Sequence, residues 1–315
     1  MLTKFPTSSH DEWLALRSKY LGGSDAAAVV GLNPNVSPFS LWMEKTGKAQ
    51  PFEGNLATQV GTYLEDFVAH LFMEATDKKV RRENASLVNS DYPFAIANVD
   101  RLVVGEDAGL EIKTCSSLAL KKFRNGEYPA KYYVQCVHYL AVTGRAKWYL
   151  AVLIGNHDFR VFEIERDEDE IAALMAQEKA FWEDHVLANV PPAPDGEDPT
   201  DESIRTLYPE SIEGSSVELF GRDKLLERWF DLAAQVKELQ RQQEEIKQTL
   251  QLDLGDTEVG LADGYKVIWK SQTRTTFDAK QFTLDHPELN LSKYWKVSAS
   301  RTFRINKTNK KESEE

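Results

Sequence analysis

An aspartate, a glutamate and a lysine stand close together in the first half of the chain, in a spacing that suits metal-assisted chemistry. Asp100 is followed after ten residues by Glu111, and Lys113 comes two positions later. The gap contains turn residues at 105–107 and Gly109, which predict a β-hairpin. On a strand, residues two apart project from the same face, so Glu111 and Lys113 would lie side by side with Asp100 near them.

Two carboxylates with a backbone carbonyl beside them are a ligand set for a hard divalent cation such as Mg²⁺, which takes oxygen ligands and keeps several waters. Lys113 could hold or deprotonate one of those waters. A solvated hairpin with mixed charges gives the same pattern, so the spacing alone leaves both interpretations open. Glu65 interrupts the apolar face of a predicted helix over 58–76. It is either an acid at the helix edge or a further group in the cleft of Asp100.

The net charge of −12 is distributed unevenly along the 315 residues. Residues 1–162 hold 18 Lys/Arg and 17 Asp/Glu, residues 163–258 hold 9 and 26, and residues 259–311 hold 11 and 4. A near-neutral first part and a basic tail leave room for DNA, because local fields decide where a polyanion binds. A solvated acidic helix with an ordinary basic tail accounts for the same counts.

The cysteine count and the N-terminus indicate the compartment. Cys115 and Cys136 are the only cysteines, which excludes a disulfide framework and a Cys-rich zinc site. The N-terminus lacks the apolar region of a signal peptide, and no run approaches the ~18 apolar residues of a membrane span. We therefore expect a soluble cytoplasmic protein with no membrane association.

The order of the elements predicts an α/β core around one central sheet. Helices are expected at 10–20, 58–76, 130–142 and 168–188, and strands around 94–102, 110–114, 147–154 and 159–164. The sequence 22–25, Gly-Gly-Ser-Asp, predicts the start of a small-residue helix, which is either an anion site or merely a turn and a cap.

Three regions follow from this pattern. We expect a core domain over 1–189, a linker over 190–220 that begins with a Pro-rich stretch, and a C-terminal region over 221–315. Apolar residues at alternating four- and three-residue steps over 222–252 predict a coiled-coil helix with an antiparallel or intersubunit partner. Strands at 264–271 and 298–305 would complete a small basic extension.

Several segments in a fixed order resemble the YqaJ viral recombinase family, in the lambda-exonuclease-like branch of the PD-(D/E)xK nucleases. They are GGSDAAAVVGLNPNVSPFSLWMEKTG, GTYLEDFVAHLF, NVD, LEIK and YYVQCVHYLAVTG, within roughly residues 10–165. The tail segments TRTTFDAKQF and SRTFRI are similar to the C-terminal part of longer members. Five ordered segments are more specific than one spacing of charged residues, so they favour the nuclease interpretation.

The resemblance implies a restriction-endonuclease-like core with a central mixed sheet flanked by helices. It also implies metal-dependent 5′-to-3′ degradation of one strand of linear duplex DNA to 5′-phosphomonoesters. The 3′ overhang that remains would serve a single-strand annealing protein in phage-type recombination. Further implications are Mg²⁺ as cofactor, with Mn²⁺ as an alternative and two ions per site, and a homo-oligomeric ring trimer through which the duplex threads.

Site residues are implied by position within the matching motifs. Asp100 and Glu111 become carboxylate ligands of the metal, and the backbone carbonyl of Ile112 adds a third oxygen. Glu65 matches the helix acid that would bind a second ion or its water shell. Lys113 matches the lysine that orients and activates the attacking water, a role that suits a group whose proton affinity its surroundings can change.

A second group of matching residues would recognise the DNA end. Arg17 and Ser24 keep the spacing of the arginine and serine that hold the 5′-phosphate, and a forked guanidinium suits a phosphate. Gln135 matches the glutamine on the helix after the catalytic strand. Two departures are visible. Asn98 stands where lambda-type enzymes place a hydroxyl residue, and Val99 replaces the proline that names the superfamily.

Two other functions fit parts of the sequence. A structure-specific or restriction-type endonuclease would use the same core, and cleavage of closed circular DNA would identify it. A catalytically silent module that binds DNA ends or assembles through the coiled coil is the third hypothesis. The combination of Asp100, Glu111 and Lys113 favours an enzyme, because a binding role does not require all three together.

Overall fold

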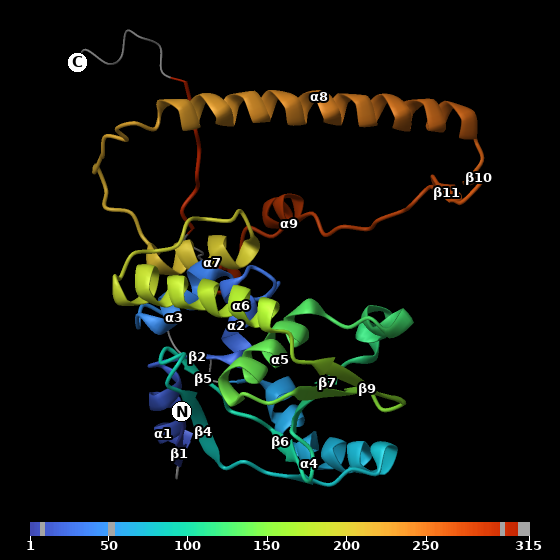
Figure 1. Cartoon of the computed structure of the whole chain (residues 1–315). Helices are drawn as coiled ribbons and strands as arrows, with labels where there is room; N and C mark the ends of the chain where they lie inside the picture. The colour runs from blue at the N-terminus through green and yellow to red at the C-terminus, as the bar shows by residue number, and fades with distance from the viewer. Residues whose placement is uncertain (7–9, 50–53, 297–299, 308–315) are drawn as a thin grey trace. The chain divides into compact units, whose positions relative to one another are not determined.

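The structure is a computed structural model that describes residues 1–6, 10–49, 54–296 and 300–307, without the side chains of residues 10, 11, 13 and 14. The chain divides into two compact units, Met1–Pro209 and Glu210–Glu315. The first unit contains all the candidate site residues, and the second contains the long C-terminal helix (Figure 1).

A five-stranded mixed sheet forms the centre of the first unit, with the strand order β3-β6-β7-β8-β9. Its strands are β3 (Val80–Arg81), β6 (Arg101–Val103), β7 (Ala108–Cys115), β8 (Lys147–Ile154) and β9 (Asp158–Glu165). β7 and β8 are parallel, and the other neighbouring pairs are antiparallel. Parallel neighbours need a crossover connection. Here it runs through the 3₁₀ segment η1 (Ser117–Gly126) and the helix α5 (Ala130–Thr143).

Strand β8 separates the hydrophobic core into two layers, because successive side chains of a strand point to opposite faces of the sheet. Trp148 and Leu150 pack in the larger cluster with α5, whereas Tyr149 and Ala151 pack with the helix α4 (Leu56–Thr76). The two helices thus cover opposite faces of the sheet.

The same alternation on β7 positions the charged residues. Leu110 and Ile112 belong to the cluster with α4. Glu111 and Lys113, which alternate with these two residues, therefore project toward the α5 face. There Lys113 Nζ lies 5.6 Å from the ring centre of Tyr132.

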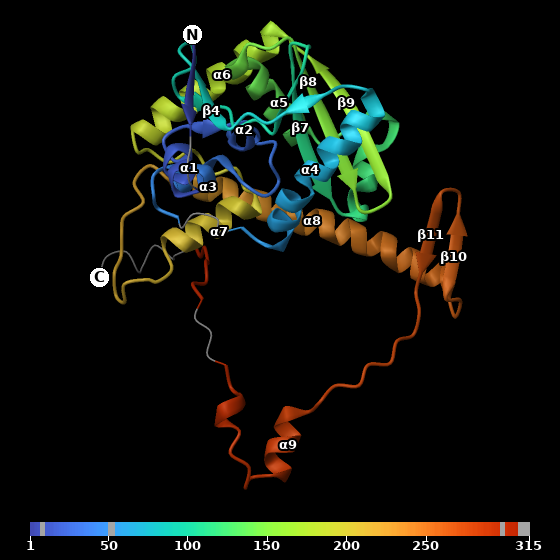
Figure 2. The same cartoon turned by 90° about the horizontal axis from the view of Figure 1, so that it is seen from below.

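Shorter elements surround this core. The remaining strands of the first unit are β1 (Leu2–Pro6), β2 (Leu21–Gly22), β4 (Ala85–Asn89) and β5 (Ala95–Ile96), paired as β1 with β4 and β2 with β5. The remaining helices are α1 (His10–Arg17), α2 (Gly23–Val29), α3 (Pro38–Lys45), α6 (Glu168–Ala180), which continues as a π-helical turn η2 (Phe181–Leu187), and α7 (Asp198–Leu207). Figure 2 shows the sheet and these helices from a second direction.

The second unit is built around the helix α8 (Asp223–Leu254). It continues through the hairpin β10 (Val259–Ala262) and β11 (Tyr265–Ile268), the helix α9 (Ala279–Asp285) and the 3₁₀ turn η3 (Ser292–Tyr294). The apolar stripe of α8 is largely exposed, with Leu225 at 60% and Ile246 at 62%.

The predicted α/β class with a central mixed sheet flanked by helices is confirmed. The strand expected around Phe94, Ile96 and Leu102 is instead two strands in different sheets. Ala97 forms one further bridge after β5, to Leu87, and residues 98–100 form no strand before β6. The strand predicted at 298–305 is wrong within residues 300–305, which form no strand, and residues 298–299 lie outside the described residues. α7 was not expected, and it lies within the segment predicted as a linker.

The parallel pair β7–β8 depends on a glycine opposite a tryptophan. A Cβ on Gly109 would lie 2.2 Å from the Trp148 ring, which is fully buried. We predict that Gly109→Ala lowers the free energy of unfolding by about 1–3 kcal/mol, the usual cost of overpacking a core. Urea unfolding measures the change.

Gly61→Ala is the matched control. A Cβ on Gly61, within α4, would meet only Thr114 Oγ1, at an ordinary contact distance of 3.5 Å, so a stabilisation of about 0.5–1 kcal/mol is expected. An unchanged unfolding midpoint for Gly109→Ala would contradict the packing.

Candidate active site

The candidate site begins where β6 and β7 separate. Arg101 pairs with Leu110, but the chain before Arg101 has left the sheet, so β7 has no strand neighbour on that side beyond Leu110. The N–H of Ile112 instead donates to Asp100 Oδ2 at 2.7 Å. Because the N–H and C=O of one strand residue point the same way, the Ile112 carbonyl faces the same side as Asp100.

Glu111 is almost completely buried, at 2% exposure, and has partners on only one of its oxygens. Gln135 Nε2 donates to Glu111 Oε1 at 2.8 Å, and Lys113 Nζ forms an ion pair with the same oxygen. Oε2 is buried and accepts no hydrogen bond from a donor in the described residues. A buried carboxylate oxygen without a donor is costly unless a cation or a water contacts it.

Burial and mutual repulsion shift the ionisation of these groups. Burial, followed by the charge of Glu111, raises the pKa of Asp100 well above its ordinary value. Burial also raises the pKa of Glu111, although Lys113 opposes this shift. The pKa of Lys113 is raised because the carboxylates of Glu111 and Asp100 outweigh the lowering effect of burial. Two carboxylates therefore share one ammonium group, and further positive charge would favour their ionised forms.

This donor set fits a divalent cation. Asp100, Glu111, Ile112 and Lys113 line one cavity of about 320 Å³, together with Glu65. No group of three or more His, Cys, Asp or Glu side chains in the described part of the chain could enclose a metal ion. Mg²⁺ commonly binds through one or two carboxylates and keeps its remaining positions for water and substrate phosphates, so two carboxylates and a carbonyl suffice.

The predicted helix acid, Glu65, lies in the cavity but is engaged by a cation. The buried guanidinium of Arg101 forms an ion pair with Glu65 Oε1, and it also donates to the carbonyl of Asp100 at 2.6 Å. Arg101 contacts Asp66 Oδ1 at 2.6 Å as well. Arg101 thus holds α4 to the start of β6 and fixes the position of Glu65 beside Asp100.

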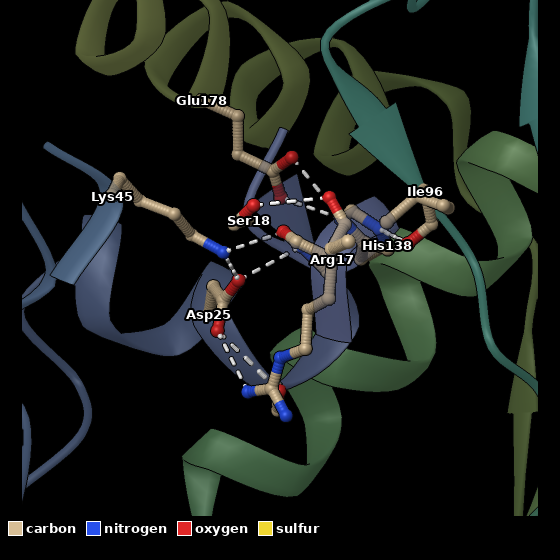
Figure 3. A network of polar contacts seen from close by, with 10 residues as sticks. Arg17, Ser18, Asp25, Lys45, Ile96, His138 and Glu178 are labelled. Atoms are coloured by element: carbon tan, nitrogen blue, oxygen red, sulfur yellow. Dashed lines mark hydrogen bonds and ion pairs between the residues drawn. The ribbon is translucent and has the colours of Figure 1, made fainter. Parts of the chain in front are cut away.

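The predicted phosphate-binding residues also lie together. Arg17 Nη2 donates to Ser24 Oγ at 3.1 Å and lies 3.4 Å from Asp25 Oδ1 (Figure 3). On its other side, Asp25 Oδ2 contacts the buried ammonium of Lys45 at 2.6 Å. Burial alone would raise the pKa of Asp25, but Lys45 and Arg17 hold it below its ordinary value. One buried carboxylate is therefore flanked by two cations.

The start of α2 differs from the expected cap. Gly22 is the N-cap residue, and its N–H donates to Asp25 Oδ2 at 3.0 Å. The carboxylate of Asp25 therefore already occupies part of the helix start. The guanidinium of Arg17 and the hydroxyl of Ser24 lie beside this helix start, and both contact Asp25 Oδ1.

Tyr139 on α5 connects the two groups of site residues. A Cβ on Gly23 would lie 2.6 Å from its ring, so α2 packs directly on it. Its hydroxyl accepts from Gln135 Nε2 at 2.9 Å and donates to the carbonyl of Asn98 at 3.0 Å. The side-chain oxygen of Asn98 accepts from Ser86 Oγ at 2.5 Å, and both residues line a second cavity of about 630 Å³ next to Glu65.

Comparison with known proteins places the chain in a family. The model of the YqaJ-like viral recombinase domain matches residues 12–146, which include every candidate site residue. A protein of Bacillus subtilis (strain 168) named YqaJ is 38% identical over 308 residues, covering 96% of this chain and 95% of the relative. The chain belongs to the YqaJ-like viral recombinase family. Membership supports a nuclease role in recombination.

Solved structures with partial similarity are also exonucleases by name. An alkaline exonuclease from Laribacter hongkongensis is 22% identical with a TM-score of 0.48, covering 57% of this chain and 94% of that chain. A phage-related exonuclease from Haemophilus somnus 129PT is 13% identical with a TM-score of 0.41, covering 56% and 99%. For the described residues, no helix of this YqaJ-family chain is both long and apolar enough to span a bilayer.

Some residues of the site were not expected from the sequence. Arg101, Asp25 and Lys45 each form a buried or half-buried ion pair with a candidate site residue or its neighbour. The signals were present but weak. Arg101 directly follows Asp100, and Lys45 stands among buried residues at the end of an amphipathic helix. Neither position identifies the acid that it pairs with.

A second unexpected pair joins α5 and α6. His138 Nδ1 contacts Glu178 Oε1 at 2.9 Å, and both side chains are fully buried (Figure 3). His138 Nε2 donates to the carbonyl of Ile96 at 3.0 Å, just before the segment that leads to Asp100. Burial lowers the pKa of His138, but Glu178 outweighs it and the net shift is upward. Burial also raises the pKa of Glu178.

These two shifts predict a pH dependence of stability. Each group binds its proton more tightly in the folded chain. The stabilisation from His138 is complete below its ordinary pKa of 6.5, and the stabilisation from Glu178 is complete below its ordinary pKa of 4.5. Each contribution is lost as the pH rises through the raised pKa of that group in the folded chain. The double variant His138→Gln/Glu178→Gln should therefore lose less stability than the wild type between pH 4.5 and alkaline pH in urea unfolding.

The exposed turn residue His157 supplies the control for this prediction. His157→Gln should keep the pH profile of the wild type, although other charged groups, including Asp25 near the pair, contribute to both profiles. Identical pH slopes for the wild type and the double variant would show that the buried pair does not contribute.

Proposed function

We propose that the chain is a divalent-metal-dependent exodeoxyribonuclease that degrades linear duplex DNA from the 5′ end. It would release 5′-phosphomonoesters and leave a 3′ single-stranded overhang. The observation that supports this most directly is the cavity shared by Asp100, Glu111 and Lys113, in which a buried oxygen of Glu111 has no donor. A solvated hairpin, the alternative interpretation of the same spacing, would not bury these groups.

Each residue has a chemical role in this proposal. Asp100, Glu111 and the carbonyl of Ile112 would hold the cation, and Glu65 would contact a second ion or its water shell. When bound, the cation neutralises charge on the scissile phosphate and stabilises the attacking and leaving oxygens. Lys113 Nζ, held against Glu111, would orient the water that attacks phosphorus. Arg101 would keep Glu65 beside Asp100.

End recognition would come from the cluster on α1 and α2. Arg17 and Ser24 would bind the 5′-phosphate, while Asp25 and Lys45 keep the guanidinium in place. Charge-assisted hydrogen bonds are among the strongest polar contacts, and a terminal phosphate offers more of them than an internal one. Gln135 and Asn98 would lie between this cluster and the metal. Gln135 donates a hydrogen bond to Glu111. The side-chain amide of Asn98 would donate to a phosphate.

We further propose Mg²⁺, with Mn²⁺ as an alternative, as the cofactor, with two ions per site. The partners would be DNA ends and a single-strand annealing protein that takes the overhang. A homo-oligomer, a ring trimer by family resemblance, would keep the enzyme on its substrate. The exposed apolar stripe of α8 supports an assembly or docking role, because such a surface is unfavourable in water.

Replacing Lys113 tests the mechanism. With Mg²⁺ and linear duplex DNA, Lys113→Ala should slow digestion by roughly 10²–10⁴-fold, the usual contribution of a positioned proton-transfer group. DNA binding in EDTA should be retained, because the two carboxylates and the end-binding cluster are unchanged.

Lys147→Ala is the matched control. This lysine starts the adjacent strand and pairs with Glu163, outside the cavity, so digestion should stay at the wild-type rate. Wild-type digestion by Lys113→Ala would exclude the proposed mechanism, and cleavage of closed circular duplex by the wild type would identify an endonuclease.

Replacing Arg17 tests end recognition separately. The wild type should digest a 5′-phosphorylated duplex faster than a 5′-hydroxyl duplex, and Arg17→Ala should reduce this preference by about 10- to 100-fold, the value of one charge-assisted hydrogen bond. The rate on the hydroxyl end should change little, because the metal ligands remain. Initial rates on the two substrates provide the measurement. Lys19→Ala, an exposed cation two residues away, is the control. Equal wild-type rates on the two ends would remove the assignment of Arg17.

A further inference from the structure

The second unit contains a stretch in which aromatic and basic residues alternate. We call residues 265–296 the aromatic–basic segment; all of them are described. Its aromatic residues are Tyr265, Trp269, Phe277, Phe282, Tyr294 and Trp295, and its basic residues are Lys266, Lys270, Arg274, Lys280, Lys293 and Lys296. Only three acidic residues occur within it. This composition stands apart from the acidic helix α8 before it.

Five of the six aromatic side chains of the segment are exposed, and Phe282 is half-buried. Phe277 is 74% exposed, Tyr294 is 72% exposed and Trp295 is 77% exposed. Large exposed rings of this kind are unfavourable in water and mark surfaces that bind something. Their side chains do not support a core, so an interaction outside the described chain is the simplest reason for them.

These rings also form a hollow. The segment around helix α9 and turn η3 forms a cavity of about 1070 Å³, lined by Phe277, Phe282, Tyr294 and Trp295 among others. The rings of Phe277 and Phe282 lie 5.1 Å apart at 54°, so they do not stack face to face on each other. The hollow therefore offers aromatic surface that is not consumed by internal stacking.

Cations border the same hollow. Lys280 and Lys293 are among its lining residues, and in the described part of the chain neither forms an ion pair with an acid. By contrast, Lys270 is paired with Glu258 at 3.0 Å. Lys293 Nζ lies 5.1 Å from the ring centre of Tyr294, so positive charge and ring are adjacent. The hollow thus combines open aromatic rings with uncompensated positive charge.

We propose that the aromatic–basic segment is a binding site for single-stranded DNA, separate from the candidate active site. Unpaired bases stack on exposed aromatic rings while lysines contact the phosphates, which is the usual chemistry of sequence-tolerant single-strand binding. Duplex DNA keeps its bases stacked internally and would use only the lysines. A purely apolar protein partner would use only the rings. Single-stranded DNA is the ligand that uses both.

This site goes beyond the proposed nuclease function, because it binds without metal and without hydrolysis. If the proposed function holds, the natural ligand would be the 3′ overhang. Binding measured in EDTA separates the two proposals: failure of the exonuclease assays leaves the binding test unaffected, and the reverse is also true.

The test uses the full chain in EDTA and fluorescence anisotropy of labelled oligo(dT) carrying a 5′-hydroxyl. Tyr294→Ala/Trp295→Ala should weaken binding roughly 10-fold or more, since stacking of one base contributes about 1–3 kcal/mol. Lys280→Glu/Lys293→Glu should also weaken binding and make the dependence of affinity on salt less steep, because fewer counterions are released. Both variants should keep the circular dichroism spectrum and the urea unfolding profile of the wild type, which shows that the chain is folded.

Control variants come from the same unit. Phe220→Ala removes a ring that is 84% exposed, and Lys247→Glu changes a cation on α8, so both should bind oligo(dT) like the wild type. If both double variants bind oligo(dT) with an affinity within about 2-fold of the wild type, the proposal is overturned. Equal losses in the controls would overturn it too, and so would binding of an acidic peptide in place of oligo(dT).

Discussion

The hydrogen bond from the Ile112 N–H to Asp100 is the contact on which the candidate active site depends. It exists because β6 begins only at Arg101, so the next backbone donor of β7 lacks a strand partner. A side-chain carboxylate replaces the missing strand. The same break places Asp100 near the charge of Glu111 and leaves the Ile112 carbonyl facing the Asp100 side. A longer β6 would satisfy the backbone of β7 and would leave no room for the carboxylate.

Helix α5 supports this arrangement from behind. Three of its residues reach different parts of the site: Gln135 bonds to Glu111, His138 to the carbonyl of Ile96, and Tyr139 to the carbonyl of Asn98. The helix therefore fixes both the catalytic strand and the irregular segment that carries Asp100. Because Gly23 allows α2 to approach the Tyr139 ring, the cluster of Arg17 is held against the same helix. One helix thus sets the spacing between the two groups of site residues.

Charge in the first unit is matched locally. Arg17 lies beside Asp25, Lys113 beside Glu111, and Arg101 beside Glu65. Each of these cations is already held in place by an acid, so it would lose little conformational freedom on binding a ligand. This arrangement favours preorganised electrostatics over long-range attraction. The basic excess of the chain is found instead over residues 259–311, where Lys280 and Lys293 border an aromatic hollow. A net charge of −12 is thus compatible with local sites for a polyanion.

The sequence by itself determined the α/β class, the strands β7, β8 and β9 and the amphipathic helices, because hydrophobic periodicity is a local property. It also singled out Asp100, Glu111 and Lys113, since types and spacing are visible in one dimension. Only the tertiary structure decided the ion pairs of Arg101 with Glu65 and of Lys45 with Asp25, and the burial of His138 with Glu178. Those partners come from distant segments, and a charged residue gives no local sign of the acid it will meet. The start of β6 only after Asp100 was equally hidden, because strand pairing depends on the position of a neighbouring segment and not on the pattern of either strand.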